Sequence, residues 1–192
     1  MRYAAAALVL AMLLAGCAGT GKNEREEMLD IRTRYIAEGD MVLNAELTAD
    51  YGERVYVYSL RYTGGAETGT MDVFEPQCIS GVSALYDDGR VTLQCGDTVI
   101  DTGELIFGMC PLEAFPFMIY AWQNGSIIDC RRERMDGIDC IAADIDMDKW
   151  QSSALCRVWF DRERSIPLLS EIFADGRCVM RCRFTQPVAP AE

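Results

Sequence analysis

Cys17 is the residue whose position most clearly predicts chemistry. It follows a short apolar run that begins near Tyr3 and ends at Leu14-Ala15-Gly16, and Arg2 is the only charged residue among the first nineteen. A helix that spans a bilayer needs about 20 apolar residues. An export signal has a basic start, an apolar core of about 7–15 residues and small residues before its cleavage site. The length therefore favours a cleaved signal peptide at residues 1–16, with an uncleaved membrane anchor as the alternative. In both cases the body of the chain is expected outside the cytoplasm.

The order Leu14-Ala15-Gly16-Cys17 resembles the lipobox of bacterial lipoprotein signal peptides. This resemblance implies transfer of a diacylglycerol to the Cys17 sulfur, cleavage after Gly16, and a mature chain that begins at the lipidated cysteine. Each buried CH₂ group of an acyl chain such as palmitate contributes about 0.8 kcal/mol, so two chains would anchor the protein stably. Residues 17–23 would form a short tether. We therefore expect a lipid-anchored protein on the extracytoplasmic face of the cell membrane.

Charge and composition exclude several classes of partner and catalyst. The chain has 18 basic and 30 acidic residues, and loss of residues 1–16, which include Arg2, leaves 17 against 30, a net charge of −13. Nucleic-acid phosphates and anionic headgroups would be repelled. No nucleic-acid partner is therefore expected, and contact with the bilayer must come from the acyl chains. The sequence contains no histidine, which excludes Ser-His-Asp and Cys-His catalysis, histidine-ligated zinc and histidine pH switches.

Other patterns that could do chemistry are incomplete. Residues 144–148, Asp-Ile-Asp-Met-Asp, imitate the start of a calcium loop, but Lys149 stands where Gly is required and Leu155 where Glu is required. A solvated strand end is the plainer interpretation. None of the carboxylates has a spacing that an acid–base pair requires. We therefore expect no enzyme activity, no cofactor and no metal. The alternative is a hydrolase whose cleft holds two carboxyl groups of raised pKa.

The chain has eight cysteines besides Cys17. An even number in an exported protein permits four disulfides, in too many pairings for the sequence to choose among. Free cysteines are also common as small apolar core residues, and we expect a mixture of the two. Cys178 and Cys182 would lie about 13 Å apart on one strand, too far for one zinc ion or for a bond between them. A cysteine on a neighbouring strand, such as Cys156, would be a better partner for Cys178 or for Cys182. The eight are Cys78, Cys95, Cys110, Cys130, Cys140, Cys156, Cys178 and Cys182.

Two segments have the pattern of helices. Asn23 is a capping residue with Glu26 three positions later, and apolar residues then recur on one stripe until Gly39. The second segment, residues 111–124, is almost wholly apolar, begins with proline and is followed by Gly125. A helix that is apolar on nearly all sides needs cover on several sides. We therefore place it against the concave face of a sheet.

Most of the remaining chain alternates with a period of two, which indicates strands. Asp-Gly pairs at 88–89, 136–137 and 175–176 are strong hairpin signals. Because no strand is followed by a helix of βαβ type, the sheet should be antiparallel, and about ten twisted strands curl. The sequence therefore predicts an α+β, mainly β fold: a strongly curved antiparallel sheet (half-barrel) with an N-terminal helix and a helix on the concave face. The predicted strands are 41–50, 55–62, a stretch containing Met71 and Val73, 83–87, 90–95, 97–101, 126–134, 138–146, 154–161, 168–174 and 177–185.

The concave face of this half-barrel would have an apolar lining. Most such residues are expected to be core, but part of the lining could form a groove for an acyl chain or for the apolar segment of a partner. The candidates come from the second strand and the second helix. They are Tyr56, Tyr58, Leu60, Tyr62, Phe117, Met118 and Trp122.

Several of these stretches resemble the LolA/LolB-like superfamily. The C-terminal pattern is Val158-Trp159-Phe160-Asp161, Pro167, Glu171-Ile172 and Asp175-Gly176 before a closing strand at 177–184. The N-terminal helix with its long strand pair also matches, as does Val73-Phe74-Glu75-Pro76 followed by Gly81. The resemblance covers roughly residues 24–186 and leaves 187–192 as a tail. Within the superfamily, the lipobox and the Cys-rich, His-free body are most similar to clostridial lipoproteins. Those lipoproteins are often labelled outer-membrane lipoprotein-sorting proteins, and they include a spore germination lipoprotein that assists a cortex amidase.

The resemblance implies a curved sheet with helices on its concave side and no catalytic residues. Periplasmic carriers of the superfamily are soluble, whereas an anchor at Cys17 would keep this chain in place, so shuttling between membranes is not expected. We expect instead that the domain binds a partner envelope protein, in sporulation, germination or cell-wall processes. The alternative is an acceptor of an acyl chain or of a lipoprotein.

Overall fold

The computed structural model describes residues 23–87, 90–104, 110–146 and 154–185. Within these ranges, one antiparallel sheet of eleven strands accompanies two α-helices, α2 (Glu24–Glu38) and α3 (Ala114–Asn124), and two 3₁₀ turns, η1 (Gln77–Ile79) and η2 (Pro111–Glu113). The α+β, mainly β prediction is confirmed. The strands are β1 (Met41–Asp50), β2 (Val55–Gly64), β3 (Thr68–Glu75), β4 (Val82–Asp87), β5 (Arg90–Cys95), β6 (Thr98–Glu104), β7 (Ser126–Met135), β8 (Ile138–Asp146), β9 (Leu155–Asp161), β10 (Pro167–Ala174) and β11 (Arg177–Phe184).

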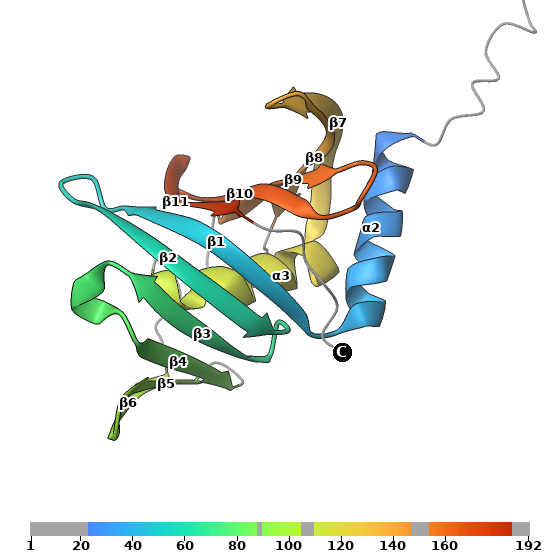
Figure 1. Ribbon diagram of the computed structural model, residues 1–192. Coiled ribbons are helices and arrows are strands. Elements are labelled where there is room, and N and C mark those ends of the chain that lie inside the picture. Colours follow the sequence, from blue (N-terminus) through green and yellow to red (C-terminus); the bar gives the residue numbers. More distant parts are fainter. Residues whose placement is uncertain (1–22, 88–89, 105–109, 147–153, 186–192) are drawn as a thin grey trace, which may run out of the picture.

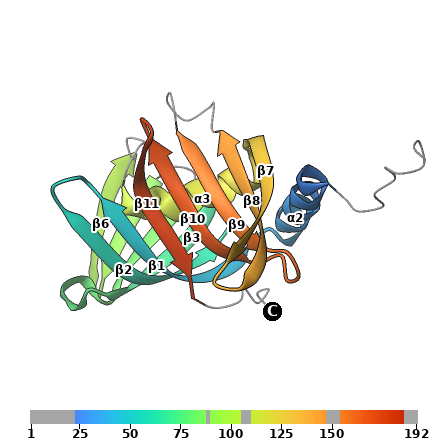
Figure 2. The ribbon, with the colours of Figure 1, turned by 90° about the horizontal axis from the view of Figure 1, so that it is seen from above.

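The order of the strands explains why α3 lies inside the sheet. The order is β6-β5-β4-β3-β2-β1-β11-β10-β9-β8-β7, so the chain runs outward from β1 to one edge and returns from the other edge to β11. Since β6 and β7 are at opposite edges, the segment between them must cross the sheet. The twisted sheet curls around α3 as an open half-barrel (Figures 1 and 2). The predicted half-barrel with a helix on its concave face is confirmed.

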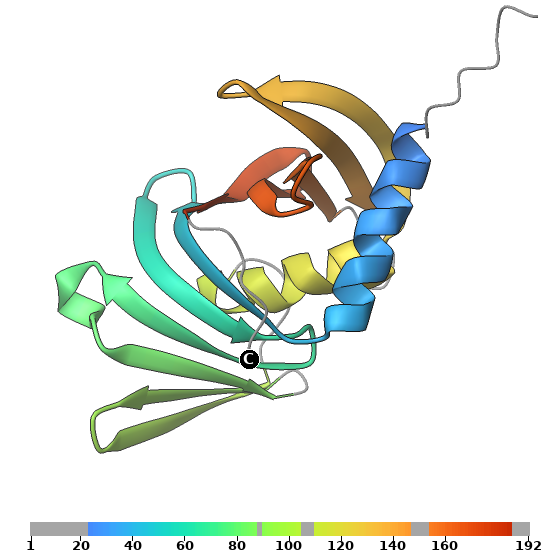
Figure 3. The same ribbon diagram turned by 45° about the vertical axis from the view of Figure 1, so that its right-hand side comes forward.

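The N-terminal helix α2 forms as its capping signal predicts. The Asn23 side chain accepts a hydrogen bond from the Glu26 backbone at 2.8 Å, and the Glu26 carboxylate accepts one from the Asn23 backbone at 3.2 Å. Its apolar stripe, Met28, Ile31 and Tyr35, is buried. The helix lies across the β7–β8 end of the sheet (Figure 3). α2 therefore contacts the edge strand β7 and its neighbour β8.

The predicted helix at 111–124 is present, with its first turn as the 3₁₀ turn η2. Eight of its residues in α3 are buried: Ala114, Phe115, Pro116, Phe117, Met118, Ile119, Ala121 and Trp122. Arg32 of α2 closes the C-terminal end, because its guanidinium donates to the carbonyls of Trp122 and Gly125, each at 2.8 Å. These carbonyls would otherwise lack a partner within the helix.

Gly125 follows the helix for a different reason from the predicted one. Its φ of −67° and ψ of 159° are extended, so the position does not need the left-handed freedom of glycine. A Cβ atom here would overlap the side chain of Ile145. Gly125 is therefore required by the close approach of β8, which the local sequence does not reveal.

The Asp-Gly turns behave as predicted where the structure describes them. Asp136-Gly137 and Asp175-Gly176 have positive φ at both positions, 50° and 86° in the first and 50° and 75° in the second, as two-residue hairpin turns of type I′ require. The pair at 88–89 lies outside the described residues. β6 extends to Glu104, three residues beyond the predicted strand.

The strand order corrects one expectation about the cysteines. Cys156 lies on β9 and Cys182 on β11, and β10 separates these two strands. Two strand spacings amount to about 9.6 Å, beyond the roughly 7 Å that a disulfide can bridge. In the described part of the chain all eight cysteines are free thiols, and Cys140, Cys156 and Cys182 are buried. The prediction that some cysteines are core residues therefore holds for these three.

Candidate functional site

The concave face changes from core to surface along a single strand. Five of the seven predicted groove residues are buried: Leu60, Tyr62, Phe117, Met118 and Trp122. The Tyr62 ring stacks on Phe115 of α3, with ring centroids 5.4 Å apart and planes 10° from parallel. The helix thus fills this part of the half-barrel. Trp122 in turn contacts Tyr35 of α2, with centroids 5.7 Å apart.

Beyond the cover of α3, the same face of β2 presents tyrosines to solvent. Side chains two positions apart share a face of a strand, so Tyr58 and Tyr56 continue the row of Tyr62 and Leu60. Tyr58 is half-buried and Tyr56 is 40% exposed. Tyr51, at the end of the β1–β2 hairpin, contacts Tyr56 at 5.9 Å, and Tyr56 contacts Tyr58 at 6.5 Å between centroids. We call Tyr51, Tyr56 and Tyr58 the tyrosine cluster.

Sequence reasoning found two members of the cluster and missed the third. Tyr51 lies in the turn after β1, where no periodicity marks it, and only the hairpin brings it back onto Tyr56. Partial burial raises the pKa of both Tyr51 and Tyr58, and nearby Cys110 adds to this. The phenols therefore remain protonated at neutral pH. They can offer an apolar ring together with a hydrogen-bonding hydroxyl.

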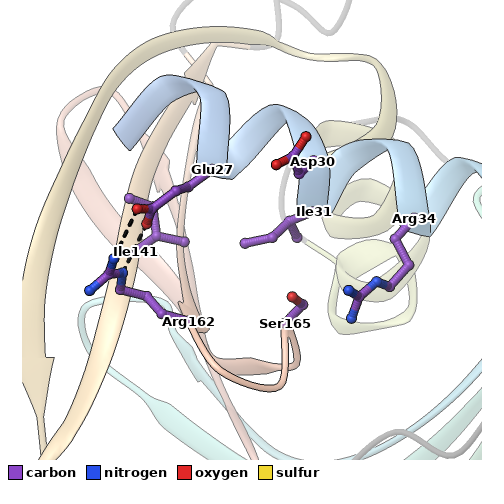
Figure 4. A pocket seen from close by; sticks show the side chains of 7 residues that line it. All are labelled: Glu27, Asp30, Ile31, Arg34, Ile141, Arg162 and Ser165. Carbon is purple, nitrogen blue, oxygen red and sulfur yellow. Dashed lines mark hydrogen bonds and ion pairs between the residues drawn. The ribbon is translucent and has the colours of Figure 1, made fainter. Parts of the chain in front are cut away.

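A hollow of ≈ 270 Å³ lies between α2 and the β9–β10 turn (Figure 4). The Arg162 guanidinium donates two hydrogen bonds to the Glu27 carboxylate, each at 2.8 Å, and Arg132 of β7 donates another at 2.7 Å. The hydrogen bond from Arg162 is the largest cause that lowers the pKa of Glu27. The lining residues are Glu27, Asp30, Ile31, Arg34, Ile141, Arg162 and Ser165.

The contacts around this hollow hold α2 against the sheet, and its residues do not suit acid–base chemistry. Glu27 is held as a carboxylate by two guanidinium groups and therefore has no proton to donate at neutral pH. On the opposite wall, Arg34 donates to the carbonyl of Arg164 at 3.3 Å, and Tyr35 donates to that of Ser165 at 3.2 Å. Sequence reasoning did not find these contacts, since the partners are more than a hundred residues apart.

The convex face carries paired charges that include the first residue of the calcium-like motif. Both carboxylate oxygens of Asp144 accept hydrogen bonds from Arg157, at 2.6 and 2.8 Å. These bonds are the largest cause that lowers the pKa of Asp144. Glu171 pairs with Arg181 through a single oxygen, Oε1, which lies 2.8 Å from Nε and 2.7 Å from Nη2 of the guanidinium. In the described ranges there is no group of three or more Cys, Asp or Glu side chains that could hold a metal ion. Residues 147–153, which include the last two residues of the motif and Lys149, lie outside those ranges.

Cys17, the predicted signal peptide at 1–16 and the predicted tail at 187–192 also lie outside the described residues. Among the helices that the structure describes, none has the length and hydropathy needed to cross a bilayer.

Comparison with solved structures identifies the fold of this chain. Neither a family model nor a curated protein matches the chain. A LolA superfamily protein from Nitrosomonas europaea matches with a TM-score of 0.50 and 10% identity, over 90% of this chain and 95% of that one. The chain has the LolA-like fold. A domain described as an outer membrane lipoprotein-sorting protein, from Vibrio parahaemolyticus, matches with a TM-score of 0.51 and 12% identity. A DUF1329 family protein from Desulfovibrio piger gives the same score and identity, and each covers 87% of this chain and 93% of its own.

The LolA-like fold accounts for the motifs on which the sequence resemblance depends. Val158-Trp159-Phe160-Asp161 forms most of β9, Pro167 begins β10, and residues 177–184 form β11 beside β1. The helix at 24–38 and the pair β1–β2 occupy the expected N-terminal positions. The resemblance inferred from the residues and the fold found by comparison agree over the described part of the domain.

Proposed function

We propose that this protein is an extracytoplasmic lipoprotein, anchored at Cys17, whose LolA-like domain at residues 24–186 binds a partner protein of the cell envelope without catalysing a reaction. The observation that carries this proposal is the tyrosine cluster. It places three contacting aromatic rings at the open end of the concave face, outside the cover of α3. Tyrosine is enriched at protein interfaces because it buries a large ring and still hydrogen-bonds. Sporulation, germination and cell-wall processes are the candidate settings.

The packing of α3 favours a protein partner over an acyl chain. Met118 and Trp122 are almost fully buried against the sheet, so an acyl chain at their position would have to displace α3. Re-exposing that apolar surface costs about 25 cal/mol per Å². A partner that docks on the tyrosine cluster needs no such rearrangement. An acyl-chain or lipoprotein acceptor is therefore the second candidate function.

The electrostatics favour binding over catalysis. Glu27, Glu133 and Asp144 have lowered pKa values because hydrogen-bond donors hold them as carboxylates. Burial raises the pKa of the Cys156 thiol to about 12, which removes thiolate character at neutral pH. None of these four groups has the protonation state that a general acid or a cysteine nucleophile needs.

The anchor is tested by metabolic labelling with an alkyne analogue of palmitate. The wild-type chain should carry the label and sediment with membranes. Cys17→Ala should lose the label and accumulate as an unprocessed precursor. Label retained in Cys17→Ala would contradict the anchor, because it would have to reside on another residue.

The binding surface is tested by a photo-crosslinking residue at position 56 or at position 57. The two neighbours have similar exposure, 40% and 49%, but lie on opposite faces of β2, so position 57 is a matched control. In membranes from growing and from sporulating cells, position 56 should give a protein adduct of defined mass that position 57 does not. A lipid adduct at position 56 would favour the acyl-chain function. Equal adducts at both positions would contradict the proposed surface.

A further inference from the structure

The strand β6 is exposed on three sides. Every side chain from Thr98 to Thr102 is exposed, and the β-branched Val99 and Ile100 are 63% and 55% exposed. Among the described strands, β6 is the edge strand and pairs only with β5 (Figure 1). β5 keeps contact with the core through the buried Val91, whereas β6 is the outermost strand on this side of the sheet. This end of the sheet would gain from being covered.

The edge strand on the opposite side, β7, contacts the helix α2. Arg132 of β7 forms ion pairs with Glu24 and Glu27 of α2, at 3.4 and 2.7 Å. A helix laid over an edge strand is one of the ways in which proteins prevent strand addition. Since α2 contacts β7 and the side chains of β6 from Thr98 to Thr102 are exposed, β6 is the better candidate for strand addition.

The hairpin register identifies the backbone groups that face outward. Cys95 pairs with Thr98 around a two-residue turn at Gly96-Asp97, so this pair is hydrogen-bonded. Because such pairs alternate along antiparallel strands, Ile100, which pairs with Leu93, directs its backbone groups toward β5. The N–H and C=O of Val99 point to the open edge.

The face of Ile100 continues the concave lining. Ile100 pairs with Leu93, and Leu93 pairs with the buried Ala84, so the three side chains share one face of the sheet. The apolar row ends at Ile100, which is more than half exposed. A further strand beside β6 would place one of its own apolar side chains at the end of this row.

Charge indicates the chemistry of that strand. Residues 41–104 carry 11 acidic and 3 basic residues, a net charge of −8, whereas residues 126–184 carry 11 and 10, a net charge of −1. Of the two halves of the sheet, the β1–β6 half thus carries nearly all the excess negative charge. Two copies joined through β6 would bring two such halves together, which like-charge repulsion opposes. A basic segment would be attracted.

We propose that β6 takes an extended segment of the partner protein as a twelfth strand, and that this segment alternates β-branched apolar residues with lysine or arginine. Main-chain hydrogen bonds to Val99 would supply affinity, and the side chains beside Ile100 would supply selectivity. This inference rests on the proposed function as a partner-binding domain and assigns the partner's chemistry at a second surface.

The test measures binding of fluorescent peptides to the purified full chain in detergent. The probe is a nine-residue peptide that alternates lysine and valine, and its comparison peptide has glutamate for lysine. Only the basic peptide should bind. Val99→Pro removes the outward N–H without removing a β5 hydrogen bond and should weaken binding about tenfold, as loss of a backbone hydrogen bond predicts. Val99→Thr keeps the N–H and should bind as the wild type does.

A second pair of variants keeps the test decisive if Val99→Pro fails to fold. Ile100→Glu and Leu85→Glu each replace an exposed apolar residue in the same half by a negative charge, but Leu85 lies on the internal strand β4. Ile100→Glu should weaken binding and Leu85→Glu should not. Equal effects of the two, binding of the acidic peptide, or a dimer of the chain lost in Val99→Pro would each overturn the inference. The proposed function is tested separately by crosslinking at position 56, and none of these peptide results changes that outcome.

Discussion

Trp159 lies on the convex face of β9, yet it is only 8% exposed. Its strand partner on β8 is Ala142, and this small residue leaves room for the indole to reach β7, where its Nε1–H donates to Glu133 at 2.7 Å. Together with Leu169 and Cys140 it forms a small second core outside the half-barrel. The tryptophan in the Val-Trp-Phe-Asp motif therefore has a packing role, which the motif alone does not explain.

Replacing this tryptophan should change how stability depends on pH. The Trp159 hydrogen bond is the largest cause that lowers the pKa of Glu133 below its ordinary 4.5. A lowered carboxyl pKa gives stability that is present above the unfolded-state value and lost as the pH falls through the folded-state value. Trp159→Phe should thus have a lower free energy of unfolding than the wild type at pH 7. When the pH falls below about 4.3, the free energy of unfolding should decrease less in the variant than in the wild type. Urea unfolding at pH 7 and pH 3.5 measures both. Parallel losses in the two proteins would contradict the assignment.

Thiol reactivity should separate the cysteines by burial. Alkylation requires the thiolate, and burial raises the pKa of Cys156 and Cys182, whereas Cys78 and Cys95 are exposed. In native protein under reducing conditions, iodoacetamide should label Cys78 and Cys95 first. Cys156 and Cys182 should react only after unfolding. Mass spectrometry of the digested chain measures the extent of alkylation at each cysteine. Early labelling of Cys156 would contradict the packing of the core.

At the scale of elements, local patterns predict where helices and strands form but not how they are fastened. The capping box at Asn23 and the alternation of β1 and β2 are local signals, and both elements form as predicted. The position of Gly125 after a helix predicts a C-terminal cap, but its role depends on Ile145, which a neighbouring strand supplies. Arg32 was not singled out, because its acceptors at residues 122 and 125 are ninety residues away.

Arg32 should therefore contribute more to stability than its neighbour Arg34. Both are on α2, but Arg32 is half-buried and donates to two carbonyls at the end of α3, whereas Arg34 is exposed and donates to one, at 3.3 Å. A hydrogen bond from a charged group is worth about 1.5–3 kcal/mol. Arg32→Ala should lower the free energy of unfolding by at least about 1.5 kcal/mol, and Arg34→Ala by less than about 0.5 kcal/mol, as at other exposed positions. Equal losses in chemical denaturation would contradict the capping role.

At the scale of the whole molecule, the curl of the sheet follows from the sequence and the strand order does not. Many antiparallel strands with one apolar helix have few ways to bury that helix, so the half-barrel was predictable. The pairing of β1 with β11 joins the two ends of the domain, and no local pattern encodes so distant a contact. For the same reason the sequence could not show that α3 covers Tyr62 and leaves Tyr56 exposed.

The two halves of the sheet should unfold together, because α3 binds them to one another. The Phe115 ring contacts Tyr62 of β2 at 5.4 Å and Phe184 of β11 at 6.3 Å, so it bridges strands from both halves. Phe115→Ala should cost about 3–5 kcal/mol, as for other buried phenylalanines. All three tryptophans follow residue 121 in the chain, so their fluorescence reports mainly the second half, whereas far-UV circular dichroism reports the whole sheet. The two signals should coincide during urea unfolding of the wild type and shift together in the variant. A dichroism change that precedes the fluorescence change would instead mean that β1–β6 opens alone, and the edge at β6 would then belong to a separately unfolding unit.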